Sequence, residues 1–96
     1  MKHALAVLLA LLAGCDAREP TVIDGSSQAA FERTAKDARR DLPDADRLYF
    51  DRAMRTVGGR WNNAPDKQRL ARVTFGGMTA QQIVEDQKAR EATGGR

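Results

Sequence analysis

The stretch Met78-Thr79-Ala80-Gln81-Gln82-Ile83 carries the clearest fold signal in this chain. Thr79 and Gln82 form the pattern of a capping box, in which each side chain accepts a hydrogen bond from a backbone N–H group of the other residue. Met78 and Ile83 stand where a hydrophobic staple places its two apolar residues, just before the cap and at the fourth helical position. The pattern predicts a helix that begins at about residue 80 and runs to about Ala92.

A first helix is predicted further upstream, over about residues 28–42, with Ser26 or Ser27 as its cap. Its apolar residues recur at helical spacing and share one face: Phe31, Ala35, Ala38 and Leu42. Pro43 ends this helix, because proline disfavours α geometry in the residue before it.

A second helix is predicted over about residues 45–57, with Asp44 as its cap and Gly58-Gly59 after its end. The turn between the first and second helices is short, which predicts an antiparallel helical hairpin. A third helix is predicted over about residues 65–75, with Leu70 and Val73 facing inward.

These elements together predict an all-α fold, a small bundle of three to four short helices. Sixteen large apolar residues lie beyond residue 15, and the chain has no pair of cysteines to form a disulfide. Sixteen large apolar residues can form one thin core. We therefore expect a free energy of unfolding of about a few kcal/mol at most, near the lower limit for small domains.

The N-terminus shows a different pattern. Lys2 and His3 precede the apolar run 4–13, whose ten residues would span about 15 Å as a helix, roughly half of a bilayer core. The run is therefore too short to cross a membrane, and it ends in the small residues that a signal peptidase requires. The pattern predicts a cleaved signal peptide over residues 1–14.

Leu12-Ala13-Gly14-Cys15 resembles the lipobox of bacterial lipoprotein precursors at all four positions. The resemblance implies that the Cys15 sulfur receives a diacylglycerol, that the chain is cut between Gly14 and Cys15, and that the new amine receives an N-acyl chain. No other cofactor is expected. The implied location is the bacterial cell envelope, with the chain anchored by lipid and facing the periplasm. Asp16 resembles the residue that retains lipoproteins in the inner membrane of enteric bacteria, which favours the inner over the outer membrane.

The chain is thus expected to have three parts: the signal peptide 1–14, the lipidated cysteine and tether 15–25, and the small helical domain 26–96. Val22 and Ile23 are too apolar for a simple linker. The second half of the tether is therefore expected to pack back on the domain.

Cleavage after Gly14 leaves 82 residues that lack the side chains most used in catalysis. The sole histidine, His3, lies in the signal peptide, and the sole cysteine, Cys15, is the lipidation site. Without the commonest general base and the best nucleophile, the mature chain is predicted to be neither an enzyme nor a metal protein. Its 15 basic and 13 acidic residues are interspersed, so nucleic acid is not an expected partner.

Two groups of charged residues are candidate sites. One is a partner patch, because arginine and tryptophan are over-represented at binding hot spots; its residues are Arg47, Arg52, Arg55, Arg60 and Trp61. The alternative is that Trp61 covers the thin core while the arginines are solvated. The second group is four aspartates around the first helix–helix turn: Asp37, Asp41, Asp44 and Asp46. They could be imagined as a calcium site, but surface ion pairs and helix capping explain them better.

Two stretches near the ends of the mature chain carry a second resemblance. Ile23-Asp24-Gly25-Ser26-Ser27 followed by Phe31, and Gly77-Met78-Thr79-Ala80 followed by Ile83-Val84, are similar to a family of small proteobacterial lipoproteins without assigned function. The resemblance implies the lipid anchor and a compact helical fold, and it implies no active site.

Three functions follow as hypotheses. The first is a non-enzymatic interaction module that binds another envelope protein. The second is a membrane-active or stress-type lipoprotein that acts on the bilayer, which the narrow apolar faces and mixed charge of the predicted helices disfavour. The third is a carboxylate-based envelope hydrolase, which would need two acids held at a fixed separation in a cleft that so small a domain hardly provides.

Overall fold

The computed structural model describes residues 19–60 and 65–94. They form the helices α2 (Gln28–Arg40), α3 (Asp44–Thr56), α4 (Lys67–Phe75) and α5 (Ala80–Ala92), with the 3₁₀ turn η1 (Val57–Gly59) after α3. The only extended pairing among these residues is an isolated bridge between Val22 and Thr79. The predicted all-α fold is therefore confirmed for this part of the chain. None of its helices has the length and apolar character needed to cross a membrane.

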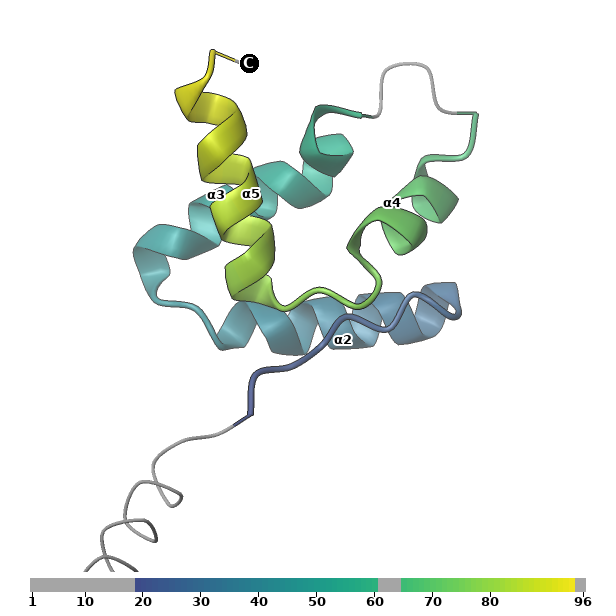
Figure 1. Ribbon diagram of the computed structural model, residues 1–96. Helices are drawn as coiled ribbons and strands as arrows, with labels where there is room; N and C mark the ends of the chain where they lie inside the picture. The colour runs from purple at the N-terminus through teal and green to yellow at the C-terminus, as the bar shows by residue number, and fades with distance from the viewer. Residues whose placement is uncertain (1–18, 61–64, 95–96) are drawn as a thin grey trace, which may run out of the picture.

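The helices enclose one core. α2 lies along one side of the domain and contacts α4 and α5, while α3 crosses α5 on the side away from α2 (Figure 1). The largest helix–helix contact joins α3 to α5. The side chains of greatest volume that are almost fully enclosed come from three separate segments: Ile23, Phe75, Ile83 and Val84.

The start of α5 agrees with its sequence signal in detail. The Thr79 hydroxyl accepts a hydrogen bond from the Gln82 N–H at 3.2 Å, and the Gln82 Oε1 accepts one from the Thr79 N–H at 2.9 Å. Ile83 is buried, and Met78 packs against the core. The capping box, the staple and the bounds of this helix are confirmed.

The other predicted helices also exist, with shifted ends. Ser27 caps α2 by accepting a hydrogen bond from the Ala30 N–H at 3.1 Å, but the helix ends two residues before the predicted Leu42. α4 begins at Lys67 behind Asp66, whose carboxylate accepts from the Arg69 N–H. Val73 was predicted to face inward, and this is wrong: it is 71% exposed, because α4 is only nine residues long and packs through other positions.

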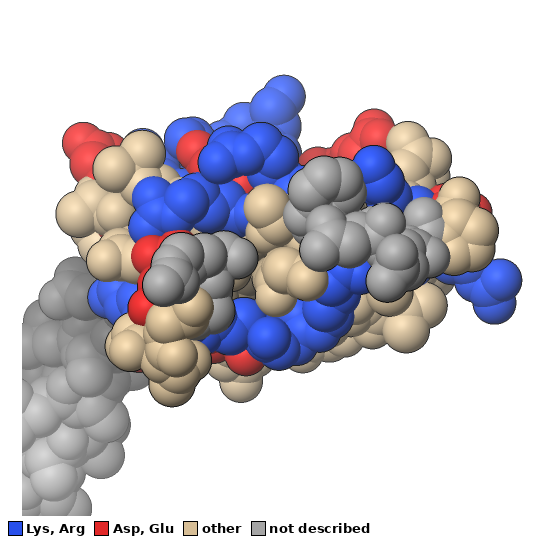
Figure 2. All heavy atoms as spheres, turned by 90° about the horizontal axis from the view of Figure 1, so that it is seen from above, with Lys and Arg blue, Asp and Glu red and all other residues tan. Residues whose placement is uncertain are grey.

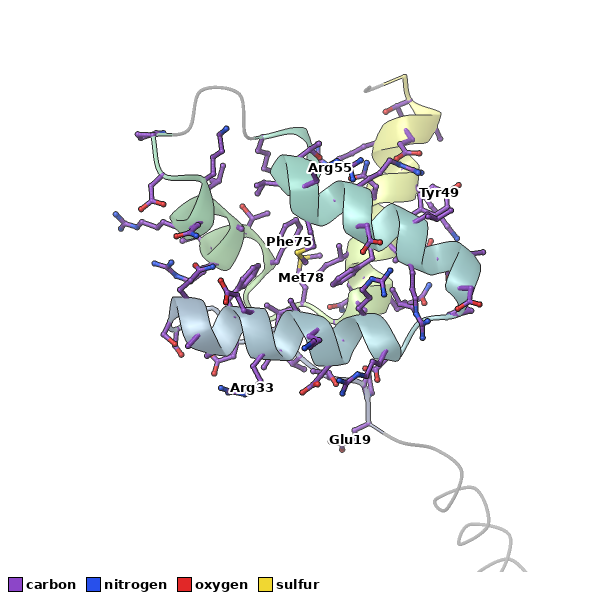
Figure 3. All side chains as sticks on the ribbon, turned by 180° about the vertical axis from the view of Figure 1, so that it is seen from behind. Glu19, Arg33, Tyr49, Arg55, Phe75 and Met78 are labelled. Atoms are coloured by element: carbon purple, nitrogen blue, oxygen red, sulfur yellow. The ribbon has the colours of Figure 1, made fainter. Side chains whose placement is uncertain are left out.

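Two predictions about α3 are wrong. Its N-cap is Pro43, and Asp44 is the first helical residue. The Asp44 carboxylate accepts a hydrogen bond from Arg47 Nη1 at 3.0 Å and does not cap the helix. α3 also packs chiefly on α5, so α2 and α3 do not form a closely packed hairpin. Phe75 and Met78, which flank the α4–α5 connection, lie between the two helices (Figure 3). Apolar residues from elsewhere in the chain therefore occupy the space that the hairpin would have closed.

The expected folding-back of the tether is observed. The Ile23 N–H donates to the Met78 carbonyl and the Gly77 N–H donates to the Ile23 carbonyl, both at 2.8 Å. Thr21 is also fixed, since its N–H donates to Asp41 at 2.8 Å. Core burial and backbone pairing therefore include the last residues of the segment 15–25 that was assigned to the tether.

Gly25 lies against the backbone of α4 with no room for a side chain. A Cβ there would collide with the Arg72 carbonyl oxygen and lie 3.4 Å from the Gly76 Cα. Gly25→Ala should therefore force the segments apart and lower the free energy of unfolding by about 1–3 kcal/mol. Urea unfolding followed by circular dichroism measures this. Ala29→Ser, which adds one atom at an exposed α2 position, should cost no more than about 0.5 kcal/mol, and equal losses would contradict the close contact.

Candidate functional site

Arg47 belongs to the turn between α2 and α3. Its Nε donates to the Arg39 carbonyl at 3.1 Å, its Nη2 to the Arg40 carbonyl at 3.3 Å, and its Nη1 to Asp44 at 3.0 Å. Both carbonyls lie at the C-terminal end of α2, where the Arg39 carbonyl also accepts from the Leu42 N–H, and the guanidinium adds donors to both and complements the helix dipole. Arg47 therefore stabilises the turn between α2 and α3. Its guanidinium is used in these contacts, so it does not act with the other residues of the predicted partner patch.

Arg52 connects α3 to α5. Its Nε and Nη2 donate to the two Glu91 carboxylate oxygens at 2.8 and 3.0 Å, in the two-pronged geometry that favours arginine–carboxylate pairs. The guanidinium also lies 4.7 Å from the centre of the Tyr49 ring. The hydrogen bonds from Arg52, followed by that from Gln87, hold the pKa of Glu91 below its usual range. This second member of the predicted patch is engaged in the α3–α5 contact.

Acid should weaken this contact. Because the pKa of Glu91 is lowered in the folded state, its contribution is present above the ordinary glutamate pKa and is lost as the pH falls below about 4, through the lowered value. Glu91→Gln should therefore unfold at lower urea concentration than the unaltered protein at pH 7, with the difference shrinking towards pH 2.5. Glu19→Gln, at an exposed position, is the control. A Glu91→Gln deficit that stays constant with pH would contradict the assignment.

The turn η1 ends α3 and contacts both α4 and α5. Val57, Gly58 and Gly59 all have positive φ, at 50°, 64° and 85°. A β-branched residue in this region costs about 1–2 kcal/mol, and the burial of Val57, which is 3% exposed, offsets that cost. The left-handed turn is therefore fixed by packing, and it sets the direction in which Arg60 leaves α3.

Arg60 and Arg90 meet over this turn. A Cβ on Gly58 would collide with Nη1 of Arg60 and lie 3.7 Å from Nε of Arg90, so both guanidinium groups border the same buried glycine. Arg60 Nη1 donates to the Val57 carbonyl at 3.3 Å, and Arg90 Nε donates to Asp86 at 3.0 Å. We call Arg60 and Arg90 the arginine pair. Figure 2 shows lysine and arginine side chains spread over this end of the domain.

The structure thus divides the predicted patch. Arg55 lies on the last turn of α3, and its exposed side chain has no hydrogen bond or ion pair with the described residues. Arg60 faces α5, where it lies near Arg90. Trp61 and the lipobox Leu12-Ala13-Gly14-Cys15 lie outside the described residues. Arg90 is not among the residues predicted for the patch, because its spacing from Asp86 is that of an ordinary ion pair along one helix. Only the packing of α5 on α3 brings it to Gly58.

The four aspartates near the first turn each have a partner of their own. Asp37 pairs with Arg40 at 3.2 Å, Asp44 with Arg47 at 3.0 Å and Asp46 with Lys88 at 3.4 Å. Asp41 accepts the hydrogen bond from Thr21. Surface ion pairs therefore account for this cluster, and no group of three or more potential metal ligands converges within residues 19–60 and 65–94.

The shifted carboxylates favour their charged forms. Hydrogen bonds from Ser26, Arg39 and Arg52 lower the pKa values of Asp24, Asp51 and Glu91, respectively. A general acid needs the opposite shift, which keeps its proton available near neutral pH. The lowered pKa values therefore do not suit these three carboxylates to the role of a general acid near neutral pH.

The described residues define a small all-α protein with an arginine pair exposed at one end. The chain belongs to a family of unknown function (DUF6694), whose model matches residues 2–91. The matched range includes the stretch 12–15, helices α2, α3 and α4 and nearly all of α5. Neither a curated protein nor a solved structure matches the chain.

Proposed function

We propose that this protein is a lipid-anchored lipoprotein of the bacterial cell envelope that acts as a non-enzymatic interaction module facing the periplasm. In this proposal Cys15 carries a diacylglycerol and an N-acyl chain after cleavage behind Gly14. Asp16 favours retention at the inner membrane. The domain that contains α2 to α5 binds another envelope protein.

The observation that carries the proposal is the short distance between the lipobox and the folded core. Cys15 lies six residues before Thr21, whose backbone is already bound to Asp41. A stretch of that length reaches at most about 20 Å. Thr21 would therefore remain within about 20 Å of the lipid surface, and the domain that begins there would meet other proteins of the envelope.

Binding is favoured over catalysis by the state of the charged side chains. The carboxylates with shifted pKa values are stabilised as anions, and the aspartates near the first turn pair separately with different donors. A hydrolase based on carboxylates would need one acid held protonated near a second acid. An exposed arginine pair is instead the kind of group that forms hot spots in protein interfaces.

A membrane-active role is the weaker candidate. It requires an amphipathic helix with a wide exposed apolar face. The large apolar residues that are exposed in the described part of the chain come from three separate elements: Val22, Leu48 and Val73. Single exposed apolar residues are ordinary in soluble domains and provide no continuous face for insertion into lipid.

Site-specific photocrosslinking in bacterial cells tests the interaction. A photoreactive residue is placed in the tagged, full-length precursor at exposed positions on different sides of the domain, such as Arg33, Leu48 and Arg55. The expected result is a discrete adduct with one protein of the membrane fraction from one side of the domain. The buried position Phe75 serves as the negative control. Equal labelling from every side, or no adduct from any position, would contradict the proposal.

A further inference from the structure

We propose that the arginine pair is the docking point for an acidic segment of the partner protein, on the side of the domain that faces away from the membrane. The inference rests on the proposed function and specifies the chemistry and position of the binding surface. Three observations support it. The two guanidinium groups have unused hydrogen-bond donors, the turn beneath them is rigid, and the tether leaves the domain on the opposite side.

The donors of the arginine pair are only partly used. Arg60 is exposed and has no carboxylate partner among the described residues, since its Nη1 meets only the Val57 carbonyl. Arg90 contacts Asp86 through Nε and leaves its two terminal nitrogens without a hydrogen bond in the described part; its side chain is 39% exposed. A carboxylate between the two groups would accept charge-assisted hydrogen bonds from both. Asp86 partly balances the charge of Arg90, whereas Arg60 has no carboxylate beside it, so the arginine pair with Asp86 keeps a net positive charge that is complementary to an acidic ligand.

The backbone beneath the pair is fixed before any ligand arrives. Val57 and Gly58 are buried in the left-handed turn, and Arg60 is the residue that directly follows the turn, with its backbone N–H donating to the Val57 carbonyl. Gly58 leaves the space that the Arg60 guanidinium occupies, because a Cβ there would collide with it. Groups already held in the bound geometry lose less entropy on binding, so the turn prepares the site.

The tether leaves the domain on the opposite side. Glu19, the first described residue, lies beyond α2 at one side of the domain, whereas the last turn of α3, with Arg55, lies at the other side (Figure 3). η1 and the end of α5 lie on this far side too (Figure 1). A domain held by a short tether from the α2 side would present the arginine pair away from its own membrane. This geometry favours an acidic protein segment over anionic lipid headgroups as the ligand.

The test uses the full lipidated chain, extracted from membranes and placed in nanodiscs of phosphatidylcholine. The probe is a fluorescent ten-residue peptide of glutamates, and binding is measured by anisotropy. Binding should weaken as salt rises, and the double variant Arg60→Gln with Arg90→Gln should bind about tenfold more weakly. The matched control, Arg33→Gln with Arg40→Gln on α2, should bind like the unaltered protein. Equal losses in both double variants would overturn the proposal, because they would show attraction by overall charge.

A second pair of variants separates the position of Arg60 from its charge. Gly58→Ala and Gly59→Ala both place alanine at a positive φ, but only the Cβ at residue 58 meets Arg60; nothing lies within 4 Å of the one at residue 59. Gly58→Ala should therefore weaken peptide binding several-fold, whereas Gly59→Ala should leave it unchanged. Thermal unfolding by circular dichroism confirms that both variants are folded. Unchanged binding by folded Gly58→Ala would contradict the inference.

Nanodiscs of phosphatidylglycerol distinguish the lipid alternative. If the anionic lipid of the disc itself abolished peptide binding by occupying the arginine pair, the surface would face the membrane and the proposal would fail. Failure of the proposed lipid anchor would be seen separately from failure of the docking point. A chain that carries no lipid would not enter the nanodiscs at all. A lipidated chain that enters the discs and ignores the peptide would refute only the acidic docking point.

Discussion

Ile23→Ala is expected to lower the free energy of unfolding by about 2–5 kcal/mol and to leave much of the protein unfolded. Ile23 is 1% exposed and belongs to the group of largest enclosed side chains. Removing its outer carbons leaves a cavity in a thin core that has no disulfide to support it. Because a domain of this size has a total stability of only about 5 kcal/mol, the loss is comparable to the whole.

Urea unfolding followed by circular dichroism at the helical band measures this effect. Val22→Ala is the matched control: it removes carbons from the adjacent residue, which is 52% exposed, and should cost less than about 1 kcal/mol. Similar midpoints for the two variants would show that the segment before α2 does not belong to the core. A large difference would demonstrate that the segment first interpreted as tether is part of the folded domain.

Cys15→Ser is expected to abolish lipid attachment completely. The proposed thioether requires a sulfur nucleophile, and a serine hydroxyl is a far weaker one at neutral pH. Two or more acyl chains hold a protein stably on a membrane, whereas a single chain gives only marginal binding. Loss of Cys15 should therefore release the protein from the membrane fraction after a high-salt wash.

Metabolic labelling with an alkyne fatty acid, together with membrane pelleting, tests this second effect. Ser26→Ala, at an exposed position beyond the lipobox, should retain both lipid label and pelleting. Persistence of both in Cys15→Ser would disprove the anchor. The fold gives an independent check, because the Cys15→Ser protein should unfold at the same urea concentration as the unaltered chain; within residues 19–60 and 65–94 the buried residues begin at Ile23.

Features set by neighbouring residues could be predicted from the sequence. The capping box at Thr79 and the Ser27 cap depend on side chains that reach backbone groups only three residues away, so the local sequence contains both partners. The charge pairs of the aspartates near the first turn were also anticipated, because two of them join residues three positions apart. Such contacts are encoded within one helical turn.

Features that depend on packing could not be predicted in the same way. Val73 fits an inward helical position by spacing but is exposed, because the helical period says which residues share a face and not which face is covered. The hairpin prediction failed for a related reason. A short turn brings two helices together only if no other part of the chain competes for the space between them, and Phe75 and Met78 do compete (Figure 3).

The four helices, the Ser27 cap of α2 and the capping box of α5 could be derived from the sequence alone, because each rests on residues within a few positions of one another. The tertiary structure decided which arginines are structural and which remain available. It assigned Arg47 to the end of α2 and Arg52 to Glu91, and it brought Arg90 beside Arg60. The physical reason is that these contacts join residues distant along the chain, and burial of the shared core selects among the arrangements that the local signals allow.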